Sequence, residues 1–282
     1  MKNKTGLILE GGGMRGAFTA GVLDAFIENN IEFDNCIGVS AGACHACSYL
    51  SKQHKRAFNT NVDYLKDKRY CSLYSLIKTG DLFGAEFIYD EIPNKLNKFD
   101  YETFDKRKTK FEVVVTNCKS GKPEYVEIKD IKKDIIYVRA SSSLPFVSRM
   151  VKINNKEFLD GGLTDSVPLT YYLKNKIDKV VVVLTRPYGY RKNKSKYTRL
   201  IKKVYKKYPN LQKALGERYI KYNETMDKID SLEKEGKIYV IRPSKKLDIG
   251  RIEKSREKLE AAYKEGYNIA KDNLKHLTDF LK

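Results

Sequence analysis

The stretch TGLILEGGGMRG, residues 5–16, decides the fold class of this chain, and CIGVSAG, residues 36–42, repeats its order of features. Each stretch starts with a short apolar run, passes through a glycine-marked turn and continues into a segment of helical periodicity. Parallel-sheet proteins place a strand, a tight turn and a helix in this order. The two stretches therefore predict an α/β fold, with both turns at the carboxyl ends of strands.

The rest of the chain alternates between strand-like and helix-like segments in the same way. The uniformly apolar run at residues 180–184 is typical of a strand that is covered on both faces, which favours a largely parallel sheet. A hairpin turn is expected at Asn154 and Asn155. The predicted strands are 5–9, 36–39, 111–116, 156–159, 179–184 and 237–241. The predicted helices are 16–28, 42–51, 88–96, 168–174, 197–208, 210–232 and 251–281.

The chain is strongly basic, and the charge is concentrated late in the sequence. Its 282 residues include 55 Lys+Arg and 36 Asp+Glu, a formal charge of +19. Residues 191–210 hold nine basic residues and no acidic one. Such a segment can attract an anionic lipid surface or nucleic acid, or it can simply keep the surface solvated. A composition shift near Tyr188 divides the chain into a domain at 1–190 and a basic, mostly helical extension at 191–282 that is expected to dock on it.

The apolar runs and the cysteines indicate in which cellular compartment the protein is expected. No run of about 18 apolar residues is present, so no membrane-spanning helix is predicted, and the apolar run near the start is too short for a secretory signal. Five cysteines are an odd number, which favours reduced thiols over a disulfide framework. We expect a cytoplasmic protein, with peripheral membrane contact as an option. The oligomeric state is left open.

The glycine-rich turn at Gly11, Gly12 and Gly13 is the first candidate site. Consecutive glycines leave bare amide groups, which together with a helix start bind negative charge. The string through Gly16 also matches the dinucleotide fingerprint, with Asp34 as a possible ribose partner. A nucleotide-binding module is therefore an alternative function.

The second candidate is Gly38-Val39-Ser40-Ala41-Gly42, which lies between a predicted strand and a predicted helix. This context turns the pattern G-x-S-x-G into a nucleophile elbow, with the Ser40 hydroxyl pushed into a cleft above a helix N-terminus. The alternative is a serine that only caps a helix.

The third candidate is Asp160, which ends a predicted strand and is followed by Gly161 and Gly162. A carboxylate at a strand end can be catalytic, although Asp-Gly is also common in ordinary turns. Each motif alone is weak, and a site is predicted because all three occur together.

These three motifs in this order resemble the patatin-like phospholipase family, over roughly residues 5–190. The tail from about Tyr190 looks similar to an extension found in some bacterial members. The resemblance implies a three-layer α/β/α fold and a serine acyl hydrolase that acts on phospholipid or lysophospholipid esters. It also implies a catalytic dyad of Ser40 and Asp160 without a cofactor. The implied oxyanion and substrate-binding loop comprises Gly11, Gly12, Gly13, Arg15 and Gly16, and the implied elbow glycines are Gly38 and Gly42. For Arg15, a role in steadying the loop is preferred over phosphate contact.

A histidine-containing triad is the competing mechanism. His45, His54 and His276 are the three histidines of the chain, and all are expected to be surface or packing residues. His45 with Cys44 and Cys47 does not converge on a metal, because these helical positions offer no fourth ligand. We therefore expect no metal site.

The substrate's acyl chain would need an apolar channel. Apolar residues in the segment 73–96 either line it or simply bury helices, and the basic amphipathic helix at 197–208 either lies on anionic lipid or packs on the domain. A weakly catalytic regulatory or scaffold protein is a further alternative. Nucleic-acid binding is not expected, because the basic segment shows no recognisable motif.

Overall fold

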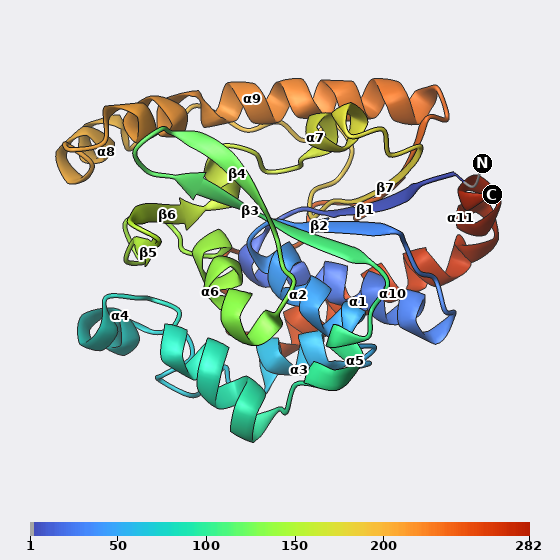
Figure 1. Cartoon of the computed structure of the whole chain (residues 1–282), viewed down its shortest axis with the longest axis horizontal. Coiled ribbons are helices and arrows are strands. Elements are labelled where there is room, and N and C mark those ends of the chain that lie inside the picture. Colours follow the sequence, from blue (N-terminus) through green and yellow to red (C-terminus); the bar gives the residue numbers. More distant parts are fainter. Residues whose placement is uncertain (1–2) are drawn as a thin grey trace.

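The computed structural model describes residues 3–282, so residues 1 and 2 of the predicted first domain lie outside the described part. One central sheet organises the molecule (Figure 1). Its strands are β1 (Thr5–Leu9), β2 (Asn35–Gly38), β3 (Lys110–Asn117), β4 (Lys122–Glu127), β5 (Val151–Ile153), β6 (Lys156–Asp160), β7 (Lys179–Val183) and β8 (Ile238–Ile241).

Within the described residues the sheet has eight strands in the order β5-β6-β3-β2-β1-β7-β8, with β4 paired to β3 outside this path. The pairs β1–β2, β1–β7, β2–β3 and β7–β8 are parallel. The pairs β3–β4, β3–β6 and β5–β6 are antiparallel. The predicted, mostly parallel sheet is therefore confirmed, and the hairpin at Asn154 and Asn155 joins β5 to β6.

Strand β3 carries two neighbours on one of its edges. β4 pairs along Glu112–Asn117 and therefore occupies one edge over that whole length. On the other edge β2 ends with Gly38 opposite Val113, and β6 ends with Asp160 opposite Val115. β2 and β6 run toward each other, so their carboxyl ends meet across about two residues of β3, roughly 7 Å along the strand.

Helices cover both faces of the sheet. They are η1 (Gly13–Arg15), α1 (Gly16–Glu28), α2 (Ala41–Leu50), α3 (Arg56–Val62), α4 (Leu73–Thr79), η2 (Phe87–Leu96), α5 (Tyr101–Asp105), α6 (Ile131–Ser141), η3 (Gly161–Leu163), α7 (Leu169–Lys174), α8 (Thr198–Val204), α9 (Pro209–Lys234), α10 (Arg256–Asp272) and α11 (Leu274–Leu281).

The alternation of side chains along β1 separates two cores. Leu7 and Leu9 pack with residues of α1, α2 and α10, whereas Ile8 packs with residues of α7 and α9. Figure 1 shows these two groups of helices on opposite sides of the sheet. The three-layer α/β/α architecture is therefore confirmed.

Residues after 190 contribute both to the sheet and to the helices that cover it. β8 extends the sheet by pairing with β7, with Ile238 opposite Val180. α10 packs closely on α1, where a Cβ on Gly21 would lie 2.0 Å from the Tyr263 carbonyl oxygen. None of the helices in the described part of the chain is long and apolar enough to cross a membrane.

Several predicted elements differ from the observed ones. The predicted helix at 251–281 is wrong as a single element, because the chain is irregular until Arg256 and α10 and α11 are separate helices that meet at Asn273. The predicted helix at 88–96 is a π-helix with Pro93 inside it, which fits the missing N–H of proline. Strand β4 and helices α3, α4, α5 and α6 were not predicted.

Candidate active site

Ser40 lies in a strained turn between β2 and α2. Its backbone angles are φ 55° and ψ −125°, a region that favours glycine. The side chain makes no capping hydrogen bond to α2, which disagrees with the alternative of a simple helix cap. The turn is held because the Ser40 N–H donates to the Ser141 hydroxyl oxygen at 2.9 Å. Ser40 is buried, at 8% relative exposure, yet it lines two cavities described below.

The elbow glycines allow backbone to approach backbone. A Cβ on Gly38 would lie 2.5 Å from the Ala43 Cα, and one on Gly42 would lie 2.4 Å from the Leu9 carbonyl oxygen. Neither contact can accommodate a side chain, so these residues act in packing the turn.

The loop Gly11–Gly13 runs directly beside Ser40. A Cβ on Gly11 would lie 2.8 Å from the Ser40 Cβ, and Gly13 adopts a positive φ of 58°. All three glycines line a cavity together with Ser40. Among residues 3–282, their amide N–H groups have no hydrogen-bond acceptor, whereas the next amide, of Met14, donates to the Arg251 carbonyl oxygen. Three amides without an acceptor among these residues therefore belong to a loop that lines the same cavity as Ser40.

Arg15 and Gly16 have different surroundings. Gly16 does not line the cavity beside Ser40; a Cβ there would lie 2.4 Å from the His45 Nε2, so this glycine serves close packing. Arg15 does line that cavity, and the relative exposure of this residue is only 6%. Burial, together with nearby Arg186, lowers the pKa of Arg15 to about 10, and its Nε has no hydrogen-bond partner among the described residues.

Asp160 ends β6 where that strand approaches the end of β2. Its carboxyl group accepts the Gly162 N–H at 2.7 Å, and its backbone carbonyl accepts the Thr116 hydroxyl at 2.8 Å. Burial raises the pKa of Asp160, whereas interactions with the Ser40 hydroxyl and the Arg218 guanidinium act against that rise. The structure therefore brings the predicted residues Ser40 and Asp160 together at one point.

Two cavities of opposite character meet at Ser40. One, of about 530 Å³, is lined mainly by apolar residues and is called the apolar cavity; the other, of about 360 Å³, is lined by seven charged residues and is called the polar cavity. Gly13, Ser40 and Leu144 line both. Volumes of this size are typical of small-molecule sites.

The segment 73–96 contributes only in part to the apolar cavity. Phe83, Ile88, Tyr89 and Ile92 line it, which agrees with the predicted channel. Other apolar residues of the segment do not: Leu82 and Phe87 are buried in the core, whereas Leu73 and Ile77 on α4 point into solvent with exposures of 71% and 86%.

The histidines lie in three separate places. His45 is buried against Gly16 beside the apolar cavity, and burial lowers its pKa to about 4, so it is neutral near pH 7. His54 pairs with Glu28 at 2.7 Å. His276 is exposed on α11, whose end contacts Asn3 before the start of β1, at the opposite end of the strands from Ser40.

The geometry also bears on the ribose contact considered for Asp34 and on metal binding, which the sequence does not predict. Asp34 lies at the amino end of the sheet, where its carboxylate accepts the Thr5 N–H at 2.8 Å, so the predicted ribose contact near Gly11 is wrong. Across residues 3–282, no three His, Cys, Asp or Glu side chains are grouped to hold a metal ion.

Some residues at the site carried no recognisable signal in the sequence. Arg186, Arg218 and Arg251 come from later segments, yet all three line the polar cavity. Lys192 belongs to the basic stretch at 191–210 and also lines the polar cavity.

Comparisons with known proteins match the part of the chain that contains Ser40 and Asp160. The family model described as patatin-like phospholipase matches residues 7–173, and one described as a domain of unknown function (DUF6363) matches residues 208–282. The chain is 27% identical over 187 residues to the uncharacterized protein YjjU of Escherichia coli, covering 64% of this chain and 52% of that protein. The chain therefore spans about half the length of that relative.

Two more distant similarities were found. The probable lipid hydrolase 463L of Invertebrate iridescent virus 6 is 24% identical over 213 residues, covering 66% of this chain and 72% of that protein. The crystal structure of VipD from Legionella pneumophila aligns with a TM-score of 0.49 and 12% identity, covering 99% of this chain and 67% of that chain.

Proposed function

The chain belongs to the patatin-like phospholipase family, and on that premise we propose that it is a serine acyl hydrolase of lipid esters. In this proposal Ser40 is the nucleophile, Asp160 is the general base, and the amides of Gly11–Gly13 form the oxyanion hole. A phospholipid or lysophospholipid is the expected substrate class. No cofactor is required by this chemistry.

The position of Ser40 between the two cavities is the observation that carries the proposal. The apolar cavity is lined by Phe83, Ile88 and Ile92 and suits an acyl chain, whereas the polar cavity suits the rest of an ester. A lipid that spans both would place its carbonyl carbon beside the serine. This arrangement supports lipid hydrolysis more directly than nucleotide binding, because a nucleotide has no use for the apolar cavity.

The reaction follows from the groups around Ser40. Its hydroxyl oxygen attacks the ester carbonyl while Asp160 accepts the hydroxyl proton. The carbonyl oxygen becomes an oxyanion and accepts hydrogen bonds from the loop amides. The loss of one such donor costs about 2.7–4 kcal/mol in other enzymes. The tetrahedral intermediate expels the alcohol, to which Asp160 returns the proton, and water cleaves the acyl-enzyme by the same route.

The environment of Asp160 makes a carboxylate a better base than it is in water. An ordinary aspartate, with a pKa of about 3.9, is a weak base toward a hydroxyl. Burial raises the pKa of Asp160 and so raises its affinity for the serine proton. No histidine is needed in this scheme, which suits the distant or buried positions of His54, His276 and His45.

Labelling with a fluorophosphonate, followed by mass spectrometry, tests the proposal. We expect one adduct on Ser40 in the full chain and none in Ser40→Ala. Ser120→Ala is a matched control, since this serine lies in the turn between β3 and β4, and it should label as the wild type does.

The alternatives give different results. A nucleotide-binding module or a scaffold on this fold would show no adduct on Ser40 and no ester hydrolysis. Hydrolysis that persists in Ser40→Ala would also contradict the assigned nucleophile.

A further inference from the structure

The polar cavity is strongly basic. Its lining includes two carboxylates, Glu10 and Asp160. It also includes five basic side chains: Arg15, Arg186, Lys192, Arg218 and Arg251. Three positive charges are therefore in excess in a cavity of about 360 Å³. Four of the five lie outside the match to the patatin-like family model, and three of these come from residues after 190.

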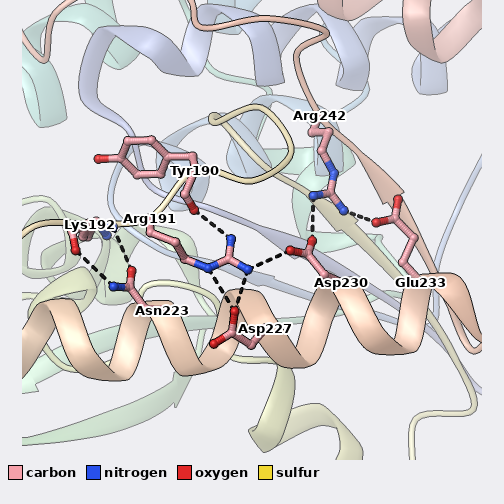
Figure 2. Close-up of polar contacts among 8 residues, drawn as sticks. All are labelled: Tyr190, Arg191, Lys192, Asn223, Asp227, Asp230, Glu233 and Arg242. Carbon is pink, nitrogen blue, oxygen red and sulfur yellow. Dashed lines mark hydrogen bonds and ion pairs between the residues drawn. The ribbon is translucent and has the colours of Figure 1, made fainter.

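These five basic residues lack the acidic partners that their neighbours have. Arg191 pairs with Asp227 at 2.6 Å and with Asp230 at 2.9 Å, and Arg242 pairs with Asp230 at 3.0 Å (Figure 2). By contrast, none of the five cavity residues forms an ion pair with a carboxylate of residues 3–282. Carboxylates thus neutralise these two nearby arginines outside the cavity, whereas the five basic residues inside it are left without such a partner.

Lys192 is held in place from both sides. Its backbone N–H donates to the Asn223 Oδ1 at 2.7 Å, and the Asn223 Nδ2 donates to the Lys192 carbonyl oxygen at 3.0 Å (Figure 2). Its ammonium lies 3.2 Å from the centre of the Tyr222 ring and donates to the Ser166 hydroxyl oxygen at 3.4 Å. The cation is therefore positioned before any ligand arrives, which lowers the entropy cost of binding.

The acidic residues of the cavity are already engaged. One oxygen of Glu10 accepts the Tyr222 hydroxyl at 2.9 Å, and the other accepts the Thr185 N–H at 2.7 Å. Asp160 interacts with Gly162 and Ser40, as described above. Arg218 donates its Nε–H to the Gly162 carbonyl oxygen, which places a guanidinium beside the proposed catalytic carboxylate.

The basic groups also repel one another. Burial, followed by the nearby Arg251, lowers the pKa of Arg218, and burial, followed by Arg218, lowers the pKa of Lys192. An anion in the cavity would relieve this repulsion and would replace the water that solvates these groups.

We propose that the basic cavity binds the phosphate-bearing headgroup of the substrate and selects headgroups that carry no positive charge. The location of the headgroup rests on the proposed function, because the ester must then reach Ser40. The selectivity follows from the charge balance: a quaternary or primary ammonium would meet five basic residues and no free carboxylate. The segment 191–282 thereby supplies much of the headgroup site, through Lys192, Arg218 and Arg251.

Binding to the Ser40→Ala full chain tests the site without catalysis. Calorimetry with glycerol 3-phosphate, inorganic phosphate and a short-chain phosphatidylglycerol below its micellar concentration should show binding of both phosphate esters. Lys192→Met should weaken that binding by about tenfold or more, as expected for one lost charge-assisted contact. Lys194→Met is the matched control, because this lysine lies outside the cavity, and it should bind as strongly as the parent. Arg251→Met, whose backbone contact to Met14 is retained, provides a second variant should Lys192→Met fail to fold.

Kinetics distinguishes the two proposals. We expect the wild type to prefer short-chain phosphatidylglycerol over phosphatidylcholine in kcat/KM, and we expect Lys192→Met to lose that preference. Ester hydrolysis with equal rates for both lipids would overturn the headgroup site and leave the proposed function standing. Phosphate-ester binding without ester hydrolysis would overturn the proposed function and leave the anion-binding cavity standing. Binding of inorganic phosphate alone would overturn the assignment to a lipid headgroup.

Discussion

Replacement of Ser40 by glycine should make the protein more stable than replacement by alanine. Both variants lose the hydroxyl, and neither loses a helix cap, because the Ser40 side chain makes no capping hydrogen bond. Besides the methyl group that glycine lacks, they differ in the backbone at φ 55° and ψ −125°, which glycine adopts without strain and alanine does not.

The size of the difference follows from two opposing effects. Strain at such an angle costs about 1–3 kcal/mol, and the extra flexibility of glycine in the unfolded chain costs about 0.5–1 kcal/mol. With central values of about 2 and about 0.75 kcal/mol, Ser40→Gly should exceed Ser40→Ala in the free energy of unfolding by roughly 1 kcal/mol. At about 2–4 °C per kcal/mol, this corresponds to several degrees in Tm.

Denaturant and thermal unfolding of the two variants measure this difference, with Ser48 as the control position. Ser48 lies within α2, so Ser48→Ala should be more stable than Ser48→Gly by about 1 kcal/mol, the opposite order. Equal stability of the two Ser40 variants, or a more stable Ser40→Ala, would refute the inference that the turn is strained.

Three further outcomes are expected. A general base must be ionised, and burial raises the pKa of Asp160. The value of kcat/KM for a neutral ester should therefore fall as the pH drops through a midpoint above about 3.9, the ordinary pKa of aspartate. A pH–rate profile with a lower midpoint would contradict this. Ester hydrolysis should survive in His45→Gln, His54→Ala and His276→Ala, and loss of kcat in a folded His276→Ala would revive a histidine mechanism. Charge reversal of the exposed lysines on α8 should reduce co-sedimentation with anionic vesicles, and equal binding to neutral vesicles would argue against membrane contact through that helix.

The packing of α8 shows why the sequence alone does not distinguish a helix that lies on lipid from one that packs on the domain. Ile201 and Tyr205 are buried in an apolar cluster, whereas Leu200 and Val204 are 42% and 49% exposed. The helical spacing predicts an amphipathic helix but not how much of its apolar face the domain covers. That fraction depends on residues such as Leu211 of α9, which contribute to the same cluster.

The elements that escaped prediction have weak local patterns. β4 begins with Lys122 and Pro123 and is half-exposed, so it shows no apolar alternation. α6 is rich in charged residues, and its burial depends on a few positions such as Ile131 and Val138. Such elements are stabilised by their tertiary neighbours, which a local pattern does not contain.

The sequence by itself determined the features that short segments encode. The first strand and its glycine loop, the G-x-S-x-G turn and the strand that ends at Asp160 are each specified by a few adjacent residues, because backbone angles and close packing are local constraints. Only the tertiary structure decided what these segments do together. The ends of β2 and β6 meet because both pair with the same edge of β3. Lys192, Arg218 and Arg251 share a cavity with Arg15 and Arg186 because the segment after 190 packs onto the sheet. Distances between such residues are set by strand pairing and helix packing, which no single stretch of the chain contains.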